Sequence, residues 1–227
     1  MDITVNGKTL IAFDGLDGSG KETQTKLLTE YLEKSGTPYR YLTFPTYHKD
    51  WSRLVTCYLN GDFGESPDSV NAYAASSFFA ADRYCSYMLD WKKDYEEGKI
   101  ILCNRYTTAN AVHQLSKLDE SLWEGFISWL YDYEFGRLGI PKPKLSIYLC
   151  VPPEIAQKHI LSRSASDSRQ MDIHEKSITH LEKSYKAALF SAEKLGWVTV
   201  NCVKDNEMRP VLDIHKEIIT VVKDFVG

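Results

Sequence analysis

The chain has 227 residues, of which 43% are apolar and 26% charged, a composition typical of a globular protein with a substantial core. Its net charge of −4 gives no basic surface for a nucleic-acid backbone, so polymeric nucleic acid is not an expected partner. The five cysteines are widely spaced and form no CxxC pair, which indicates neither a disulfide framework nor a zinc site. No basic leader and no apolar run of about 18 residues is visible, so we expect a cytoplasmic protein without a membrane partner.

Short apolar runs alternate with longer helix-like segments along the chain, which is typical of a parallel sheet with crossover helices. Most of these runs are continuous, as expected for strands that are buried on both faces. We therefore expect one α/β domain over residues 1–227, with five strands at Leu10–Asp14, Tyr39–Phe44, Ile100–Asn104, Leu145–Val151 and Trp197–Cys202.

Capping residues predict where several helices begin and end. Ser66 and Pro67 predict the start of a long helix that Gly98 ends. Asp119 is expected to cap a helix that runs to about Leu138. The same chemistry predicts helix starts at Pro153, at Pro210 and after Asp172, and a helix end at Gly196.

The segment GLDGSGKETQ, Gly15–Gln24, is similar to the phosphate-binding P-loop GxxxxGK[ST]. It follows a buried strand and opens a helix, as a P-loop does. Its glycines let backbone N–H groups close around phosphates, while Lys21 and the helix N-terminus supply positive charge. Glu22 stands where the pattern has a hydroxyl for Mg²⁺. The predicted ATP-binding residues are Gly15, Gly18, Ser19, Gly20, Lys21, Glu22 and Thr23.

This loop is followed by four further motifs, namely TFP at Thr43–Pro45, FFAADR at Phe78–Arg83, NRY at Asn104–Tyr106 and SRSASDSRQMDIHE at 162–175. In this order, from Leu10 to about Phe225, the motifs resemble the thymidylate kinase family. The resemblance implies a P-loop NTPase fold with three α/β/α layers, a five-stranded parallel sheet and a lid segment at about 162–175. It also implies transfer of the γ-phosphoryl group of ATP to dTMP with Mg²⁺ as cofactor, giving dTDP and ADP, and a homodimer.

Several residues are expected around the acceptor nucleotide. Phe79 and Arg83 are four residues apart and share a helix face, and by resemblance they stack on thymine and hydrogen-bond it. The resemblance places Arg105 at the phosphate, Asp17 near the deoxyribose 3′-hydroxyl and Asn110 at the base edge. The full predicted set is Asp17, Phe44, Pro45, Phe79, Arg83, Arg105, Tyr106, Asn110 and His113.

One position in this set, and one just outside it, depart from the family. His113 falls where relatives often carry a tyrosine that excludes a ribose 2′-hydroxyl, and as a lone histidine it could equally be packing. Thr46 lies near where many relatives have an arginine for the monophosphate, and Lys49 or Arg53 could compensate.

Phosphoryl transfer depends on positioning and cationic stabilisation, so the catalytic residues are expected to be cations. The serine-rich run at 162–175 has the composition of a lid, and by resemblance its arginines act in cis as arginine fingers; a solvated charged loop is the alternative. The predicted catalytic residues are Lys21, Arg105, Arg163 and Arg169.

The metal site is unusual, because Asn104 stands where the family has an aspartate and Glu22 where a P-loop has a hydroxyl. One hypothesis is that the carboxylate has moved, with Asn104 and Glu22 together serving Mg²⁺. In the other, Glu22 points to solvent, Thr23 binds the α-phosphate and substrate phosphates hold the metal. A nucleotide-binding paralogue with impaired transfer is a third possibility. A deoxynucleoside kinase would need a general base, and no ExR-type base follows the second strand.

Overall fold

The computed structural model describes residues 7–166 and 178–226, and its centre is a five-stranded parallel sheet in the order β2-β3-β1-β4-β5. All five predicted strands are confirmed, with ends that differ by at most one residue. Their bounds are β1 Leu10–Gly15, β2 Tyr39–Thr43, β3 Ile100–Asn104, β4 Leu145–Cys150 and β5 Val198–Asn201.

Burial follows position in the sheet. Every residue of β1 is buried, as are the first four of β3, because both strands have a neighbour on each side and a helix layer on each face. The edge strands β2 and β5 keep several residues partly or fully exposed. The ends of the central strands therefore form a rigid base on which loops can be positioned.

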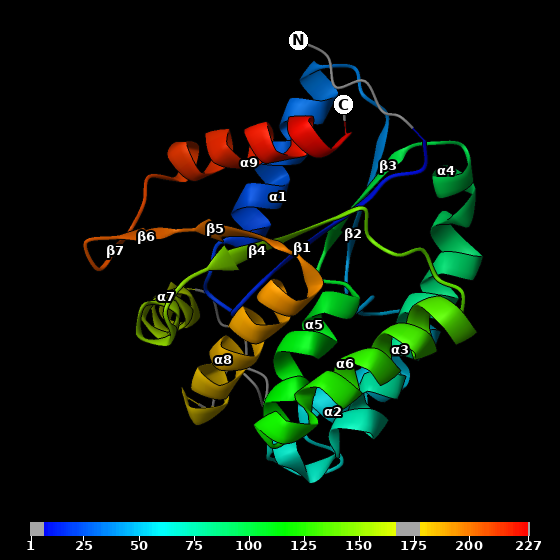
Figure 1. Cartoon of the computed structure of the whole chain (residues 1–227), viewed down its shortest axis with the longest axis vertical. Helices are drawn as coiled ribbons and strands as arrows, with labels where there is room; N and C mark the ends of the chain where they lie inside the picture. The colour runs from blue at the N-terminus through cyan, green and yellow to red at the C-terminus, as the bar shows by residue number, and fades with distance from the viewer. Residues whose placement is uncertain (1–6, 167–177, 227) are drawn as a thin grey trace.

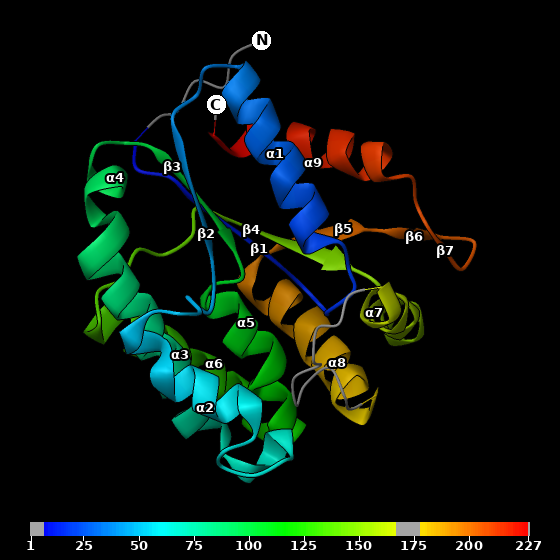
Figure 2. The same cartoon turned by 180° about the vertical axis from the view of Figure 1, so that it is seen from behind.

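Helices cover both faces of the sheet (Figure 1). On one face α1, Lys21–Lys34, lies beside α9, Val211–Val226, and on the other α5, Thr107–His113, lies beside α8, Ile178–Leu195. The view from behind shows the same two layers (Figure 2). This confirms the three-layer α/β/α fold.

A second group of helices packs beyond the carboxyl ends of β2 and β3 (Figure 2). It contains α2 (Arg53–Asn60), α3 (Ala72–Ser86) and α6 (Trp123–Tyr131). After α3, the π-turn η3 (Tyr87–Trp91) and α4 (Lys92–Glu96) lead back along the sheet to the start of β3. Short 3₁₀ turns connect these elements at η1 (Asp50–Ser52), η2 (Pro67–Ser69), η4 (Leu115–Lys117) and η5 (Glu120–Leu122).

Two of the predicted helix starts are wrong. Ser66 caps only the short turn η2, by accepting a hydrogen bond from Asp68 N, and the long helix begins at Ala72, where Asn71 Oδ1 accepts from Ala74 N. Asp119 makes no side-chain capping bond and precedes the 3₁₀ turn η5 rather than an α-helix. In both places a short turn intervenes between the capping residue and the long helix.

Other boundaries agree with the prediction. Gly98 and Gly196 follow helices in the left-handed conformation, with φ of 85° and 66°. α7, Pro153–Ser166, begins at its proline and α9 directly follows Pro210. The helix expected after Asp172 is described from Ile178, and residues 167–177, with Asp172 and His174, lie outside the described residues.

The remaining elements are a π-turn and a small hairpin. The π-turn η6, Asp132–Arg137, continues α6, and the antiparallel pair of β6, Val203–Lys204, with β7, Glu207–Met208, follows β5. All five cysteines lie in the described part of the chain, and none forms a disulfide. None of the helices in residues 7–166 and 178–226 has the length and apolar character needed to cross a bilayer.

Candidate functional site

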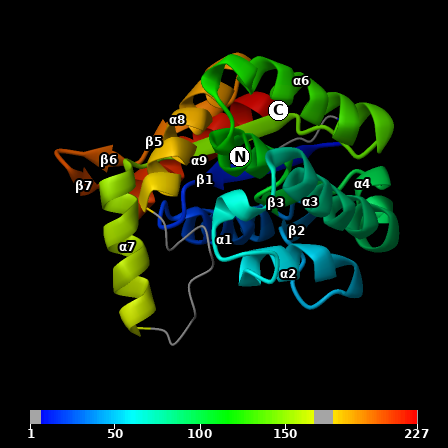
Figure 3. The same ribbon diagram turned by 90° about the horizontal axis from the view of Figure 1, so that it is seen from below.

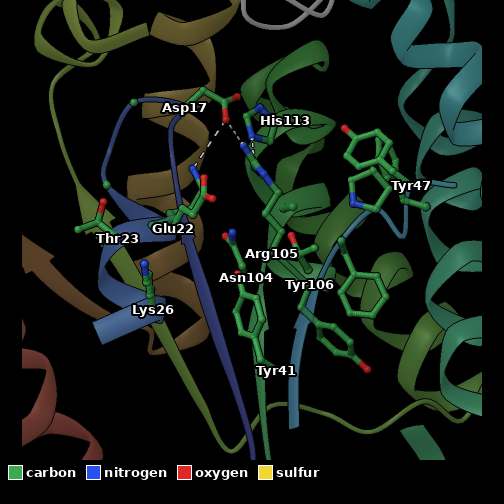
Figure 4. A pocket seen from close by; sticks show the side chains of 18 of the residues that line it. Asp17, Glu22, Thr23, Lys26, Tyr41, Tyr47, Asn104, Arg105, Tyr106 and His113 are labelled. Atoms are coloured by element: carbon green, nitrogen blue, oxygen red, sulfur yellow. Dashed lines mark hydrogen bonds and ion pairs between the residues drawn. The ribbon is translucent and has the colours of Figure 1, made fainter. Parts of the chain in front are cut away.

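A pocket of about 930 Å³ opens where the carboxyl ends of β1, β2 and β3 meet the N-terminus of α1 (Figure 4). This is the edge at which parallel α/β sheets bind ligands. Gly15 and Ser19 do not line the pocket: Gly15 lies at the base of the loop and Ser19 is buried. The pocket brings together most of the site residues predicted from sequence, namely Asp17, Gly18, Gly20, Lys21, Glu22, Thr23, Phe44, Pro45, Phe79, Arg83, Asn104, Arg105, Tyr106, Asn110 and His113.

The glycine loop is held in one shape by close backbone contact. Gly18 has a φ of +80°, and a Cβ there would lie 2.4 Å from the carbonyl oxygen of Ala156 in α7. Gly20 has a φ of 86° and is the N-cap residue of α1. Backbone N–H groups at this helix start are directed toward the pocket, which is the arrangement that binds anions.

Lys21 is tied to the loop that it follows. Its Nζ donates to the carbonyl oxygens of Gly15 at 2.8 Å and Leu16 at 2.7 Å, and it lies 3.8 Å from Asp17 Oδ1. The side chain is buried, with 8% of its surface exposed. The ammonium group is therefore held at the glycine loop by contacts within the protein.

Arg105 is the centre of a charged cluster directly after β3 (Figure 4). Its backbone adopts a φ of 66°, which aims the side chain across the end of the sheet. Nη2 donates to Asp17 Oδ1 at 2.6 Å, Nη1 lies 2.8 Å from His113 Nε2, and Asp14 Oδ1 is 3.6 Å from Nη1. Arg105 and Asp17 were both among the predicted substrate-binding residues, and the structure brings their side chains into direct contact.

The charges in this cluster stabilise one another. Burial disfavours the ionised form of Asp17, but Arg105 and Lys21 outweigh it and hold the pKa of this carboxyl well below its usual range. Burial likewise opposes the charge on Arg105, and Asp17 with Asp14 raises its pKa above the ordinary value. Asp17 is thus ionised and Arg105 charged throughout the neutral range.

His113 is a partner of Arg105 rather than packing alone. A guanidinium group has only donors, so His113 Nε2 accepts this hydrogen bond and the ring is neutral, with its proton on Nδ1. The ring also stacks on His180 of α8, with centroids 5.7 Å apart and planes at 21°. His113 therefore fixes one edge of Arg105, a role that the lone-histidine argument did not predict.

His180 gives the fold a pH dependence that can be measured. Burial and the Lys117 charge lower its pKa from 6.5 to about 4, so the folded protein holds this ring neutral while the unfolded chain protonates it below pH 6.5. The contribution of His180 to the free energy of unfolding is therefore complete above pH 6.5. It falls by about 3 kcal/mol as the pH drops toward 4. We expect His180→Phe to remove this part of the pH dependence of the free energy of unfolding, measured by urea denaturation at pH 7 and pH 4.5. An unchanged difference between the two pH values would contradict the assignment.

Arg83 is completely enclosed at the far end of the pocket. Its Nε and Nη2 donate to the two carboxylate oxygens of Glu134 at 2.6 and 2.5 Å, and both side chains are at most 1% exposed. Glu134 lies in the π-turn η6 and was not among the predicted site residues. An acidic residue inside the aromatic run WEGFISWLYDYEFG was the signal that could have identified it.

The aromatic residues predicted to contact substrate form the walls of the pocket. Phe79 faces the pocket and packs edge-on against Tyr58, with centroids 6.1 Å apart. Tyr106 has no exposed surface, and its hydroxyl donates to the carbonyl of Pro141, so it supports the wall from behind. Phe44 packs edge-on against Tyr106 and lines the same side.

Asn104 and Glu22, the two unusual metal-site residues, both reach this pocket from β3 and α1 (Figure 4). Asn104 Oδ1 is buried and accepts no hydrogen bond from any described residue. Asp14, the other carboxylate at this end of the sheet, is fully engaged, because it accepts from Gly15 N and from Thr108 Oγ1.

Neither Thr46 nor the two cations expected to compensate for the missing monophosphate arginine lies in the pocket. Thr46 bonds through its backbone N–H and its hydroxyl to the carboxylate of Asp82, and it does not line the pocket. Lys49 and Arg53 lie in the described part of the chain, and neither lines the pocket. The pocket is also lined by residues outside the predicted set, among them Lys26, Tyr41 and Tyr47.

Of the two predicted lid arginines, the structure describes only the backbone of Arg163. Arg163 lies in α7, which extends away from the body of the protein (Figure 3), and its side chain is not among those described. Arg169 lies outside the described residues. Two neighbouring residues of α7, His159 and Ser162, line the pocket, so this helix reaches the site.

Comparison with known proteins gives one consistent family. The family model for thymidylate kinase matches residues 13–218. A thymidylate kinase from Mycobacterium tuberculosis (strain CDC 1551 / Oshkosh) is 29% identical over 192 residues, which cover 83% of this chain and 87% of that protein. One from Plasmodium falciparum (isolate 3D7) is 28% identical over 93% of this chain and 88% of its own length. The solved thymidylate kinase of Candida albicans shares the fold, with a TM-score of 0.67, 18% identity, and coverage of 97% of this chain and 93% of that one.

Proposed function

The chain belongs to the thymidylate kinase family, and we propose that it transfers the γ-phosphoryl group of ATP to dTMP, giving dTDP and ADP. The observation that carries this proposal is the single pocket shared by a phosphate loop and a base-binding wall, with Arg105 between them. The loop would hold the ATP phosphates, and the wall with Phe79 and Arg83 would hold a base. This arrangement fits a reaction between two nucleotides.

The acceptor is proposed to lie with its base against Phe79 and its phosphate near Arg105. Phe79 offers a flat face for stacking, and Arg83 donates to a carbonyl oxygen of thymine that cytosine replaces by an amino group. Arg105 and the hydroxyl of Tyr47 are the candidates for the monophosphate, because Thr46 is committed to Asp82. Asp17, held by Arg105, is proposed to lie near the deoxyribose 3′-hydroxyl.

The transfer step requires charge stabilisation rather than a base. Charge spreads over the equatorial oxygens of the transferring group, and a phosphate acceptor has no proton that must be removed at neutral pH. Lys21 and Arg105 are proposed to stabilise this charge from the described part of the site. Arg163 and Arg169, in a lid at about 162–175 of a single domain, are proposed to add cations when both substrates are bound; replacing each by methionine and measuring kcat tests this.

Mg²⁺ is proposed as the cofactor, and the residues present fit it. The orphaned Asn104 Oδ1 and the Glu22 carboxylate are hard oxygen donors at the ends of β3 and α1. Mg²⁺ usually takes one or two protein ligands and completes its shell with water and substrate phosphates. Bound there, it would neutralise phosphate charge. Within the described residues no cluster of three His, Cys, Asp or Glu side chains competes for a metal.

A double-mutant cycle tests how these two residues share the metal. If the carboxylate has moved from β3 to α1, Asn104→Asp alone places two carboxylates at the site. It is expected to lower the Mg²⁺ concentration that half-saturates the enzyme and, because the extra negative charge repels the substrate phosphates, to lower activity about tenfold. The double variant Glu22→Thr with Asn104→Asp is expected to restore both the Mg²⁺ dependence and the activity. Binding of Mg²⁺–ADP, measured by calorimetry, provides a readout besides activity. Additive effects of the two changes would instead favour Glu22 pointing to solvent.

A product assay decides between this function and the alternatives. The purified protein is incubated with ATP and Mg²⁺ and with dTMP, dUMP, dCMP, UMP or thymidine, and the nucleotides are resolved by chromatography. We expect dTDP from dTMP. Formation of dTMP from thymidine would favour a deoxynucleoside kinase, and nucleotide binding without any product would favour an impaired paralogue.

Exposed apolar side chains and unpaired cysteines bear on the assembly and the location of the protein. We propose a homodimer that covers apolar side chains left exposed on α3 and η3, of which Leu89 is 70% exposed. Sedimentation equilibrium tests this, and a monomer at micromolar concentration would contradict it. The five unpaired cysteines fit a reducing compartment, so we propose the cytoplasm, which fractionation of the source cells tests.

A further inference from the structure

The carboxylate of Glu134 is saturated with donors. Oε1 accepts from Arg83 Nη2 at 2.5 Å and from Asn110 Nδ2 at 3.2 Å, and Oε2 accepts from Arg83 Nε at 2.6 Å and from Thr107 Oγ1 at 2.7 Å. Its side chain has no exposed surface. Arg83 comes from α3, while Thr107 and Asn110 come from α5, so one buried carboxylate joins two helices at the base-binding wall.

This carboxylate decides which way the Asn110 amide faces. Asn110 Nδ2 points to two acceptors, Glu134 Oε1 and the carbonyl oxygen of Ser76 at 3.3 Å. Turning the amide over would put its oxygen against both of these oxygens, so the orientation follows from chemistry. Because both amide N–H groups are used, Asn110, which lines the pocket, has only an acceptor, Oδ1, left for a ligand.

The same carboxylate fixes the neighbouring donor. One edge of the Arg83 guanidinium, formed by Nε and Nη2, is bound to Glu134, while Nη1 donates to the carbonyl oxygen of Tyr106 at 3.4 Å. Arg83 lines the pocket although it is almost completely buried, so only a small part of its donor surface meets a ligand. The pocket wall thus presents a donor from Arg83 and an acceptor from Asn110.

We propose that Glu134 is a specificity-determining positioning residue, which sets this donor–acceptor pair and thereby selects pyrimidines with a carbonyl at C4 and a proton on N3. Thymine and uracil complement the pair, whereas cytosine has an amino group and an unprotonated nitrogen at the same two positions and opposes it. This inference rests on the proposed function, because it requires that the base of dTMP lies against Arg83 and Asn110. Glu134 itself does not touch the substrate and acts through these two side chains.

The test compares two substitutions that change different properties of Glu134. Glu134→Gln keeps the size but turns one acceptor oxygen into a donor, which must face Arg83 or Asn110. We expect the KM for dTMP to rise about 10- to 100-fold and the preference for dTMP over dCMP in kcat/KM to fall at least tenfold. The kcat and the KM for ATP are expected to stay within about threefold. Glu134→Asp changes the size but keeps two acceptor oxygens, so it is expected to retain most of the preference.

A control separates specificity from loss of stability. Ile218→Ala, at a fully buried position in α9 on the opposite face of the sheet from α5, is expected to lower the melting temperature without changing the preference for dTMP. If Glu134→Gln does not fold, the double variant Arg83→Gln with Glu134→Gln, which buries no charge, replaces it. That variant is expected to bind dTMP and dCMP with affinities within about threefold of each other, and a larger preference would overturn the proposal.

The outcomes for the proposed function and for Glu134 are distinguishable. Binding of dTMP and dCMP is measured by calorimetry without ATP, alongside turnover. Wild-type protein that neither binds nor phosphorylates dTMP would overturn the proposed function and this inference with it. Wild-type protein that prefers dTMP, with Glu134→Gln keeping that preference unchanged, would overturn the role of Glu134 alone.

Discussion

Replacing Arg105 by methionine is expected to lower kcat/KM for dTMP by about three orders of magnitude, which steady-state kinetics with varied dTMP and ATP will show. The physical reason is that Arg105 is the cation between the phosphate loop and the base-binding wall, already held in place by Asp17 and His113. A group fixed before the reaction stabilises developing charge without reorganising. Removing it also leaves Asp17 without its main counter-charge.

Lysine is not expected to replace Arg105. The planar guanidinium bonds Asp17 through Nη2 and His113 through Nη1 at the same time, and a single ammonium group cannot reproduce that geometry. We therefore expect Arg105→Lys to recover less than about a tenth of the lost activity. Arg137→Met, which removes an exposed arginine that pairs with Asp132, is the control and is expected to act like wild type. Near-normal turnover in Arg105→Met would exclude Arg105 from catalysis.

The phosphate loop could be predicted from sequence because its parts are consecutive. A buried strand, a glycine loop and a helix follow one another within Leu10–Lys34, and local chemistry alone defines each of them. The same holds for the central strands β1, β3 and β4, whose apolar runs reflect burial on two faces. Helix starts were less predictable, because Ser66 and Asp119 have the chemistry of caps but begin short 3₁₀ turns.

The pocket wall formed by Phe79, Arg83 and Asn110 could be predicted only in part from the sequence. Glu134 lies 51 residues after Arg83. Its place inside an aromatic run is a local signal that the carboxylate could be buried, but nothing local indicates which cation it would face. A buried charge needs a partner, and that partner is fixed by how α3, α5 and η6 pack. The contact between His113 and Arg105 was missed for a similar reason, because the left-handed backbone of Arg105 turns its side chain toward α5.

The largest expected effect on the ATP side comes from Lys21. Lys21→Met is expected to lower kcat about 1000-fold, because methionine has no charge to place beside the transferring phosphoryl group. The KM for ATP is expected to rise as well, since the bonds from Nζ to the carbonyls of Gly15 and Leu16 hold the loop closed.

Lys26→Met is the matched control for this experiment. Lys26 lies on the same helix and lines the same pocket, but it comes after the phosphate loop and has no bond to the loop carbonyls. We expect this variant to change kcat less than tenfold, because its charge contributes to the general field of the pocket rather than to a fixed contact. Equal losses of kcat in the two variants would mean that only the total positive charge of the pocket matters. The specific role of Lys21 would then be wrong. A loss confined to Lys21→Met, with nucleotide binding still measurable, would place its effect on the transferring group itself.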